Sequence, residues 1–139
     1  MRKAPEWALP ETVLTVHEQL LAEFGGLSGV RDAGLLDSAL ARPQNLLAYG
    51  QPDAFDLAAS YGFGIVKNHP FNDGNKRTGF TVAVSFLELN GYRFQAAEAD
   101  AIVRTLALAA GAMKEAEYAA WLKANSIRNV PRRTATSNF

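Results

Sequence analysis

The sequence predicts an all-α fold, a compact bundle of five to seven helices, on three observations. Apolar residues recur at helical spacing along most of the chain. Prolines, glycines and aspartates stand where these stretches begin and end. Strand signals are nearly absent, because no segment is seen to alternate apolar and polar residues over four or more positions between turn signals.

The first predicted helix covers residues 10–24, where Pro10 suits the first turn and Gly25 suits the end. The glycines that follow predict a flexible link. Asp32 can cap a second, short helix, which is expected to end near Pro43 because the residue before a proline avoids the helical conformation. Residues 43–52 (PQNLLAYGQP) lie between prolines without helical periodicity, so they predict an exposed loop or small hairpin.

Two helices that are apolar nearly all round come next, from the cap Asp53 to about Asn68 and from about Asn75 to Asn90. Helices of this kind are central ones. The sequence therefore predicts that residues 69–74 are a short connector between the two most buried helices.

Apolar spacing predicts two further helices, near residues 98–110 and 114–125. The last residues are polar and contain a proline. We therefore expect a single domain of residues 1–126, followed by a flexible tail of residues 127–139.

Composition excludes several classes of function. Lys and Arg number 14, as do Asp and Glu, so the overall charge predicts no binding to nucleic acid or to an anionic membrane. The absence of cysteine excludes disulfides, thiolate nucleophiles and cysteine zinc sites. The chain starts without a signal peptide and has no apolar run long enough to span a membrane, so a cytoplasmic protein is expected.

Most of the candidate chemistry lies in the stretch His69–Thr78 (HPFNDGNKRT). His69 can act as a general base near neutral pH, and Asp73 is a carboxylate of the kind that binds Mg²⁺ together with waters and substrate phosphates. The expected helix start at Asn75 offers unpaired N–H groups and a positive dipole end, which favour phosphate. These are the parts of a site for phosphoryl or nucleotidyl transfer.

The other motif residues suit the same chemistry. Gly74 lets the backbone approach phosphate oxygens, and Asn75 can cap the helix that binds them. Lys76 and Arg77 lie where the helix dipole disfavours cations, which suggests an anion between them.

Structural alternatives stay open for single residues. His69 could be a helix cap, Asp73 with Gly74 could be a plain turn, and adjacent cations are usually a solvated face. His17, the other histidine, is expected to be structural or on the surface. The chain has no GxxxxGK[ST] loop, no GxGxxG after a strand and no nucleophile beside the motif histidine, which argues against P-loop, dinucleotide-binding and protease functions.

HPFNDGNKRT resembles the signature of the Fic/Doc family, HPFx[DE]GN[GK]R, and residues 25–44 and 86–94 resemble its Doc (death-on-curing) branch. The resemblance implies a helical Fic-type fold and transfer from a nucleoside triphosphate, ATP, to a hydroxyl of a target protein. It implies that His69 is the general base and that Asp73 holds Mg²⁺. It also implies a flap at residues 43–52, to which an extended target segment can add as a strand. The phosphate-binding residues it implies are Gly74, Asn75, Lys76 and Arg77.

Two positions differ from the Fic enzymes that transfer AMP, which typically have glycine in place of Lys76 and arginine in place of Phe80. Both resemble the Doc branch, which is understood to present the γ-phosphate of ATP and to phosphorylate elongation factor Tu. The chain lacks the self-inhibiting string [ST]xxxE[GN]. A separate Phd-type antitoxin is therefore expected, with a C-terminal segment that folds as an amphipathic helix into an apolar groove.

The resemblance thus implies the toxin of a toxin–antitoxin system, a protein kinase that acts on a Ser or Thr hydroxyl of a translation factor and inhibits translation. Two alternatives remain: a Fic-type AMP transferase, and a catalytically silent module that only binds a partner. The complete set of His69, Asp73, Asn75, Lys76 and Arg77 argues against the silent module.

Overall fold

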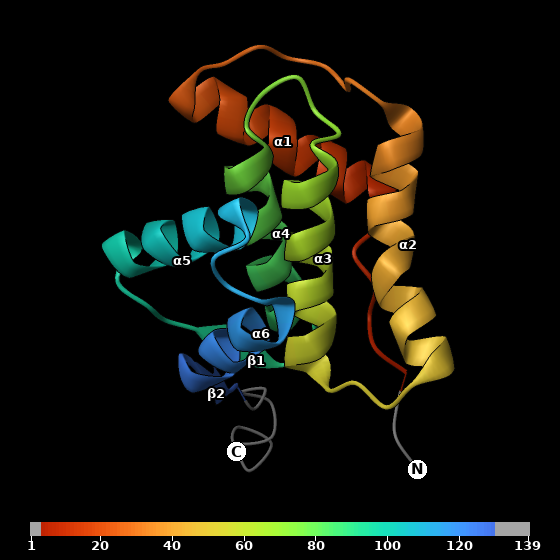
Figure 1. Ribbon diagram of the computed structural model, residues 1–139, viewed down its shortest axis with the longest axis vertical. Helices are drawn as coiled ribbons and strands as arrows, with labels where there is room; N and C mark the ends of the chain where they lie inside the picture. The colour runs from red at the N-terminus through yellow and green to blue at the C-terminus, as the bar shows by residue number, and fades with distance from the viewer. Residues whose placement is uncertain (1–3, 130–139) are drawn as a thin grey trace, which may run out of the picture.

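Six helices and one pair of short strands make up the computed structural model, which describes residues 4–129 (Figure 1). The predicted all-α bundle is therefore confirmed. None of these helices has the length and apolar character that a membrane crossing requires. The elements are α1 (Pro10–Phe24), α2 (Ala33–Tyr49), α3 (Ala54–Asn68), α4 (Asn75–Leu89), β1 (Tyr92–Phe94), α5 (Glu98–Ala110), α6 (Glu115–Ala124) and β2 (Ser126–Arg128).

Helices α3 and α4 form the centre of the bundle, as their apolar surfaces predict. α3 packs against α4, α2 and α6, and α1 packs across α4 (Figure 1). The two central helices approach closely because glycines lie at their contact. A Cβ added to Gly79 would stand 2.9 Å from Val66 Cγ1 and 3.1 Å from the carbonyl oxygen of Gly62. Because α3 and α4 lie so close together, the six residues 69–74 are enough to join them. This segment is called the motif connector below.

Helix α2 is longer than predicted, because it continues through Pro43 to Tyr49. A proline inside a helix removes one hydrogen bond and costs about 3 kcal/mol. Packing offsets that cost here: Pro43 is buried, and Arg42 pairs with Glu115 of α6 at 3.0 Å. The predicted helix end near Pro43 is therefore wrong, and so is the predicted loop or hairpin over residues 43–52.

The strand pair β1–β2 was not predicted. The strands are antiparallel, with Tyr92 opposite Arg128. A weak signal exists, since Tyr92, Arg93, Phe94 and Gln95 alternate apolar and polar residues over the length of one short strand. The first residues of the predicted tail, up to Arg128, lie in β2, and residues 130–139 lie outside the described residues.

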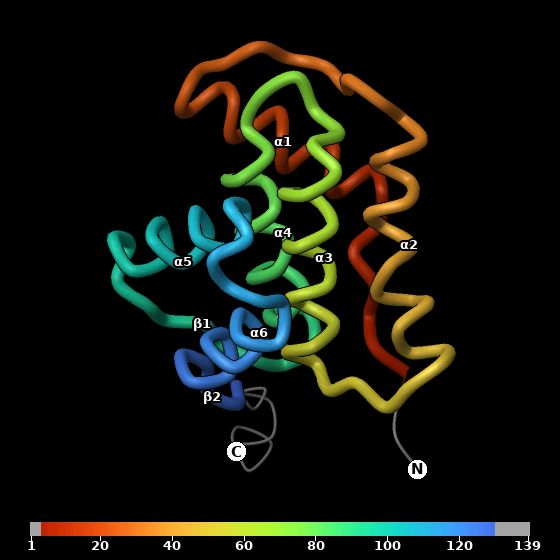
Figure 2. The backbone as a smooth tube through the Cα atoms, viewed as in Figure 1, coloured from red at the N-terminus to blue at the C-terminus, as the bar shows by residue number. Residues whose placement is uncertain are grey.

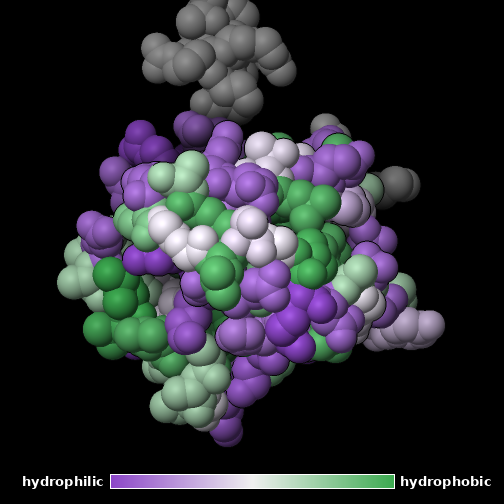
Figure 3. Space-filling view, turned by 90° about the horizontal axis from the view of Figure 1, so that it is seen from above, coloured by the Kyte–Doolittle hydropathy of each residue, from purple (hydrophilic) through white to green (hydrophobic). Residues whose placement is uncertain are grey.

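The α1–α2 loop (residues 25–32) passes over the motif connector at one end of the molecule (Figure 2). It was predicted to be a flexible link, but it is tied down. The N–H groups of Arg31 and Asp32 donate to the carbonyl of Pro70 at 2.7 and 3.0 Å, and Asn72 N–H donates to the carbonyl of Gly29 at 3.1 Å. Seen from above, this end of the molecule mixes hydrophilic and hydrophobic surface (Figure 3).

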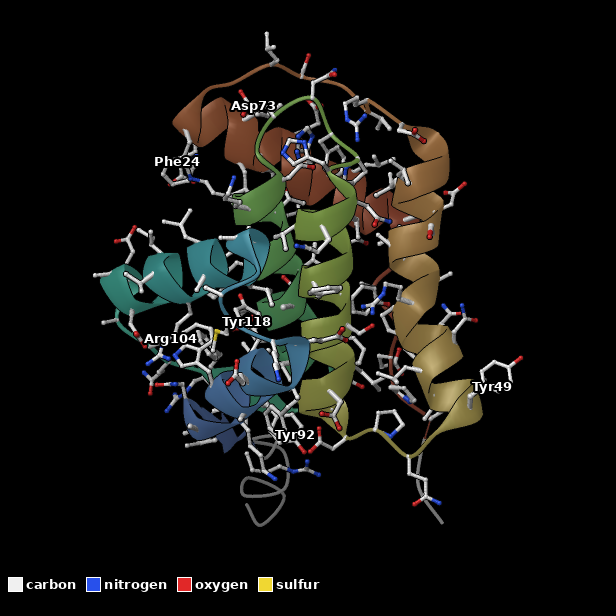
Figure 4. The ribbon with its side chains drawn as sticks, in the orientation of Figure 1. Phe24, Tyr49, Asp73, Tyr92, Arg104 and Tyr118 are labelled. Atoms are coloured by element: carbon white, nitrogen blue, oxygen red, sulfur yellow. The ribbon has the colours of Figure 1, made fainter. Side chains whose placement is uncertain are left out.

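Residues 43–52, which the resemblance implied to be a flap, do not lie beside the motif connector (Figure 4). Tyr49, near the end of α2, lies at the opposite end of the molecule from Asp73 (Figure 4). The segment that does lie beside the motif connector is the α1–α2 loop, where Val30 forms a single antiparallel bridge with Phe71.

Candidate active site

His69 follows α3 directly and stands in the left-handed conformation, with φ 55° and ψ 52°. Among residues 4–129 it is the only residue other than glycine with a positive φ. Left-handed residues commonly end helices, although a Cβ makes the conformation unfavourable. The side chain is exposed and lines a cleft, so the imidazole can meet a substrate.

Asn75, at the start of α4, is buried and its amide holds the motif connector closed. Its Oδ1 accepts from the N–H of Phe71 at 2.9 Å, and its Nδ2 donates to the Phe71 carbonyl at 3.0 Å. These two bonds fix the orientation of the amide, so Nδ2 is also the donor to His69 Nδ1 at 3.2 Å. The neutral imidazole of His69 then carries its hydrogen on Nε2.

His17 supports the motif connector from α1. Its ring is buried and stacks on Phe71, with 3.8 Å between ring centroids and 12° between ring planes. Its Nε2 donates to the carbonyl of Asp73 at 2.8 Å. Of the two roles expected for His17, structural or on the surface, the structure shows the structural one.

The carboxylate of Asp73 is exposed and oriented by two backbone groups. Oδ1 accepts from the N–H of Gly74 at 2.9 Å, and Oδ2 accepts from the N–H of Leu27 at 3.2 Å. No group of three or more His, Cys, Asp or Glu side chains that could hold a metal ion occurs within residues 4–129. One oriented carboxylate fits Mg²⁺, which commonly completes its shell with waters and substrate phosphates.

The first turn of α4 suits an anion. Gly74 caps the helix with φ 77°, a conformation that favours glycine. The first backbone bond of α4 runs from Thr78 N–H to the Gly74 carbonyl, so the N–H groups of Asn75, Lys76 and Arg77 have no partner inside the helix. The side chains of Lys76 and Arg77 are exposed, and the guanidinium of Arg77 lies 4.2 Å from the ring centroid of Phe24.

A cleft of about 1190 Å³ opens beside this turn, between the motif connector and α5. Its lining mixes polar and apolar residues. Among the apolar ones, Phe80 packs its ring against Phe94 and Trp121, with centroids 5.8 and 6.3 Å apart. The polar lining comes from the motif residues His69, Asp73, Gly74, Asn75, Lys76 and Arg77, and also from Thr81, Gln95, Glu98, Thr105 and Asn125. The apolar lining includes Leu20, Phe24, Phe80, Val84, Ile102 and Leu106.

The pKa shifts of Tyr118, Tyr61 and Asp100 have structural causes. Burial raises the pKa of Tyr118 to about 12, although Thr105, which lines the cleft, bonds its hydroxyl at 2.8 Å. Burial also raises the pKa of Tyr61. Hydrogen bonds from Trp121 and Arg104 lower the pKa of Asp100.

The structure therefore brings all six predicted site residues to one cleft. It gives Asn75 a different task from the one implied, because its side chain bonds inward to Phe71 and His69. Only its backbone N–H is left for an anion. The sequence did not predict that the α1–α2 loop contacts the motif connector. The glycines of this loop were a signal that its backbone approaches another segment closely.

The model of the Fic/DOC family matches residues 7–87. The chain belongs to the Fic/Doc family. It is 36% identical over 83 residues to a protein of Escherichia phage P1 named "Protein kinase doc", a match that covers 59% of this chain and 66% of that protein. It is 46% identical over 76 residues to "Toxin Doc" of Mycolicibacterium smegmatis (strain ATCC 700084 / mc(2)155), covering 52% and 58%. Both relatives carry the Doc name, which supports the Doc branch of the Fic/Doc family, although the chain spans less than two thirds of each.

Proposed function

We propose that this Fic/Doc protein is a Doc-type toxin, a protein kinase that transfers the γ-phosphate of ATP to a Ser or Thr hydroxyl of a translation factor. Elongation factor Tu is the proposed target. The observation that carries the proposal is the convergence of an exposed imidazole, an oriented carboxylate and an anion-binding helix start on one cleft. One relative is named a protein kinase and the other a toxin, and these names support the proposal.

In this proposal the first turn of α4 binds the triphosphate. The N–H groups of Asn75, Lys76 and Arg77 have no acceptor within the helix and form the positive end of its dipole. The charges of Lys76 and Arg77 add to them. Asp73 would hold Mg²⁺, which when bound supplies positive charge that offsets the charge developing on the phosphate oxygens.

His69 takes the hydrogen of the attacking hydroxyl. The hydroxyl oxygen forms a bond to the γ-phosphorus, the bond from that phosphorus to the bridging oxygen breaks, and ADP leaves. General-base help of this kind contributes about 10²–10⁴-fold to the rate. The N–H groups at the start of α4 stabilise the charge on the phosphate oxygens in the transition state.

A base at Nε2 needs the imidazole with its hydrogen on Nδ1, whereas the contact with Asn75 favours the hydrogen on Nε2. The Asn75 amide is fixed by its bonds to Phe71, so with the hydrogen on Nδ1 two N–H donors would face each other. The ring must therefore turn away from Asn75 when His69 acts as the base, with the loss of one long hydrogen bond, worth about 1 kcal/mol. Because tenfold in rate corresponds to about 1.4 kcal/mol, that loss is smaller than the gain of about 10²–10⁴-fold from a general base.

Two side chains support transfer of phosphate over transfer of AMP. Lys76 fills space at the phosphate end of the cleft, where AMP-transferring relatives typically have glycine. Phe80 packs with Phe94 and Trp121, so no second arginine reaches the phosphates from that turn of α4. Both features favour the pose that presents the γ-phosphate.

The exposed apolar residues that line the cleft suit the proposed antitoxin. Phe24, Ile102 and Leu106 are large apolar residues that stay about half exposed on α1 and α5. An amphipathic helix of a Phd-type antitoxin can cover such a surface, since helix-in-groove binding uses apolar anchors of this kind.

Mass spectrometry of the target tests the proposed function. The purified protein is incubated with ATP, Mg²⁺ and elongation factor Tu, in parallel with His69→Ala. We expect a phosphate-sized mass gain with the wild type and none with the variant. An AMP-sized gain would assign the protein to the AMP transferases. In a second arm both proteins are expressed in bacteria, and equal growth arrest by the wild type and His69→Ala would assign it to the silent binding modules.

A further inference from the structure

Arg31 contacts three consecutive carbonyls at the end of α3. Its guanidinium Nε donates to the carbonyl of His69 at 2.8 Å, and Nη2 donates to the carbonyl of Asn68 at 3.1 Å. Its backbone N–H donates to the carbonyl of Pro70 at 2.7 Å. Arg31 belongs to the α1–α2 loop, 38 residues away from His69 in sequence, so these bonds are tertiary ones.

This position matters because of the conformation of His69. The last carbonyls of a helix lack partners within it and form the negative end of its dipole, which a guanidinium stabilises. A non-glycine residue in the left-handed region persists only where its surroundings fix it. Two bonds from one planar fork fix the peptide planes on both sides of the His69 Cα, and these planes decide where its ring points.

Within residues 4–129 the ring of His69 itself is held only weakly, by its contact with Asn75. The side chain of His69 is exposed, and its bond to Asn75 is long at 3.2 Å. Arg31 is also exposed, yet within residues 4–129 none of the ion pairs involves it. The guanidinium therefore interacts with the carbonyl oxygens of residues 68 and 69, and none of the ion pairs of residues 4–129 joins it to a carboxylate.

We propose that Arg31 is a positioning residue for His69, holding the backbone of the general base so that its imidazole stays in the cleft. The inference rests on the proposed function only where it assigns His69 a part in phosphate transfer. Lysine cannot replace Arg31 fully, because an ammonium group is a single point that does not bridge two adjacent carbonyls in one plane.

The test uses the full chain with Arg31→Ala and Arg31→Lys, and Arg42→Ala as the matched control. Arg42 also bonds to α3 from outside it, through the carbonyl of Ser60 at 3.3 Å, but this contact lies in the middle of α3 and not at its end beside His69. The first readout is the ¹⁵N spectrum of the imidazoles, which needs no activity. The chain has two histidines, so the buried His17 serves as the internal reference.

We expect Arg31→Ala to move the ring signals of His69 toward those of an imidazole in free tautomer exchange, while the His17 signals stay in place. We expect kcat to fall about 10–100-fold, as for a misplaced catalytic group, with KM for ATP changing less than about threefold. Arg31→Lys should recover part of kcat. Arg42→Ala should lower the melting temperature and leave the His69 signals unchanged.

Unchanged His69 signals in Arg31→Ala would overturn the inference, as would an equal change in Arg42→Ala. Melting temperatures measured by circular dichroism show whether a variant loses activity because it unfolds. If all variants melt at the wild-type temperature and Arg31→Lys has as low a kcat as Arg31→Ala, the inference is also contradicted. If the wild type transfers no phosphate, the proposed function fails, but the imidazole spectrum still decides the role of Arg31.

Discussion

The two ends of α3 are held in different ways. At its first turn Asp53 and Asp56 form a capping box, in which each side chain accepts from the backbone N–H of the other, at 2.8 and 2.9 Å. At its last turn the bonds come from residues far away in sequence, above all from Arg31. The first end closes a helix with local chemistry. The second end carries His69 of the candidate site in a left-handed conformation that local sequence does not favour. Residues distant in sequence therefore hold this end in place.

His69→Ala should show most clearly that the last turn of α3 serves activity and not stability. The variant removes the base and nothing that the fold needs, since the side chain is exposed. Phosphate transfer should fall about 10²–10⁴-fold, with the melting temperature unchanged. Initial rates with labelled ATP measure the effect, and a loss smaller than tenfold would remove the imidazole from the chemistry.

His17 tests the support of the site end from α1. His17→Ala should leave a cavity against Phe71 and destabilise the fold by about 3 kcal/mol. His17→Phe keeps the stacking and loses only the bond to the Asp73 carbonyl, at about 1 kcal/mol. Chemical denaturation measures both. Equal losses for the two variants would mean that the ring stacking contributes nothing.

Gly79→Ala should push α3 and α4 apart, because its Cβ would stand 2.9 Å from Val66 Cγ1. We expect a loss of stability of about 1–3 kcal/mol from overpacking. Gly34→Ala in α2 is the matched control: its nearest contact would be 3.4 Å, and a helical alanine should be neutral or slightly stabilising. If both variants have the stability of the wild type, close packing does not set the length of the motif connector.

Asp53→Ala should have the smallest effect. It removes a local cap and so lowers stability by about 1 kcal/mol. Transfer activity should stay at the wild-type level, because Asp53 lies at the far end of α3 from His69. Parallel measurement of kcat and melting temperature checks this. A large loss of activity at unchanged stability would show that the two ends are coupled.

The sequence predicts features that depend on local bonds, such as helix caps, and does not predict features that depend on tertiary contacts. The starts of α2 and α3 follow from Asp32 and Asp53, whose side chains accept from N–H groups three residues ahead. The length of α2 does not follow, since burial of Pro43 and the pair of Arg42 with Glu115 outweigh the break that proline favours.

The motif shows the same limit within the candidate site. Its residue types and spacing are enough to predict which six residues share a cleft. They do not predict that the Asn75 amide turns inward to Phe71 and His69, or that the α1–α2 loop clamps the motif connector. Those contacts are set by chain segments that meet only in the folded protein.

The most direct test of the central claim, that the start of α4 seats a triphosphate beside the His69 imidazole, is an amide NMR titration. The ¹⁵N-labelled protein is titrated with Mg²⁺ and a non-hydrolysable ATP analogue. We predict that the largest shifts occur at the backbone N–H groups of Asn75, Lys76 and Arg77, together with the ring signals of His69. Saturating analogue that leaves these four residues unshifted, or shifts only residues outside the cleft, would contradict it.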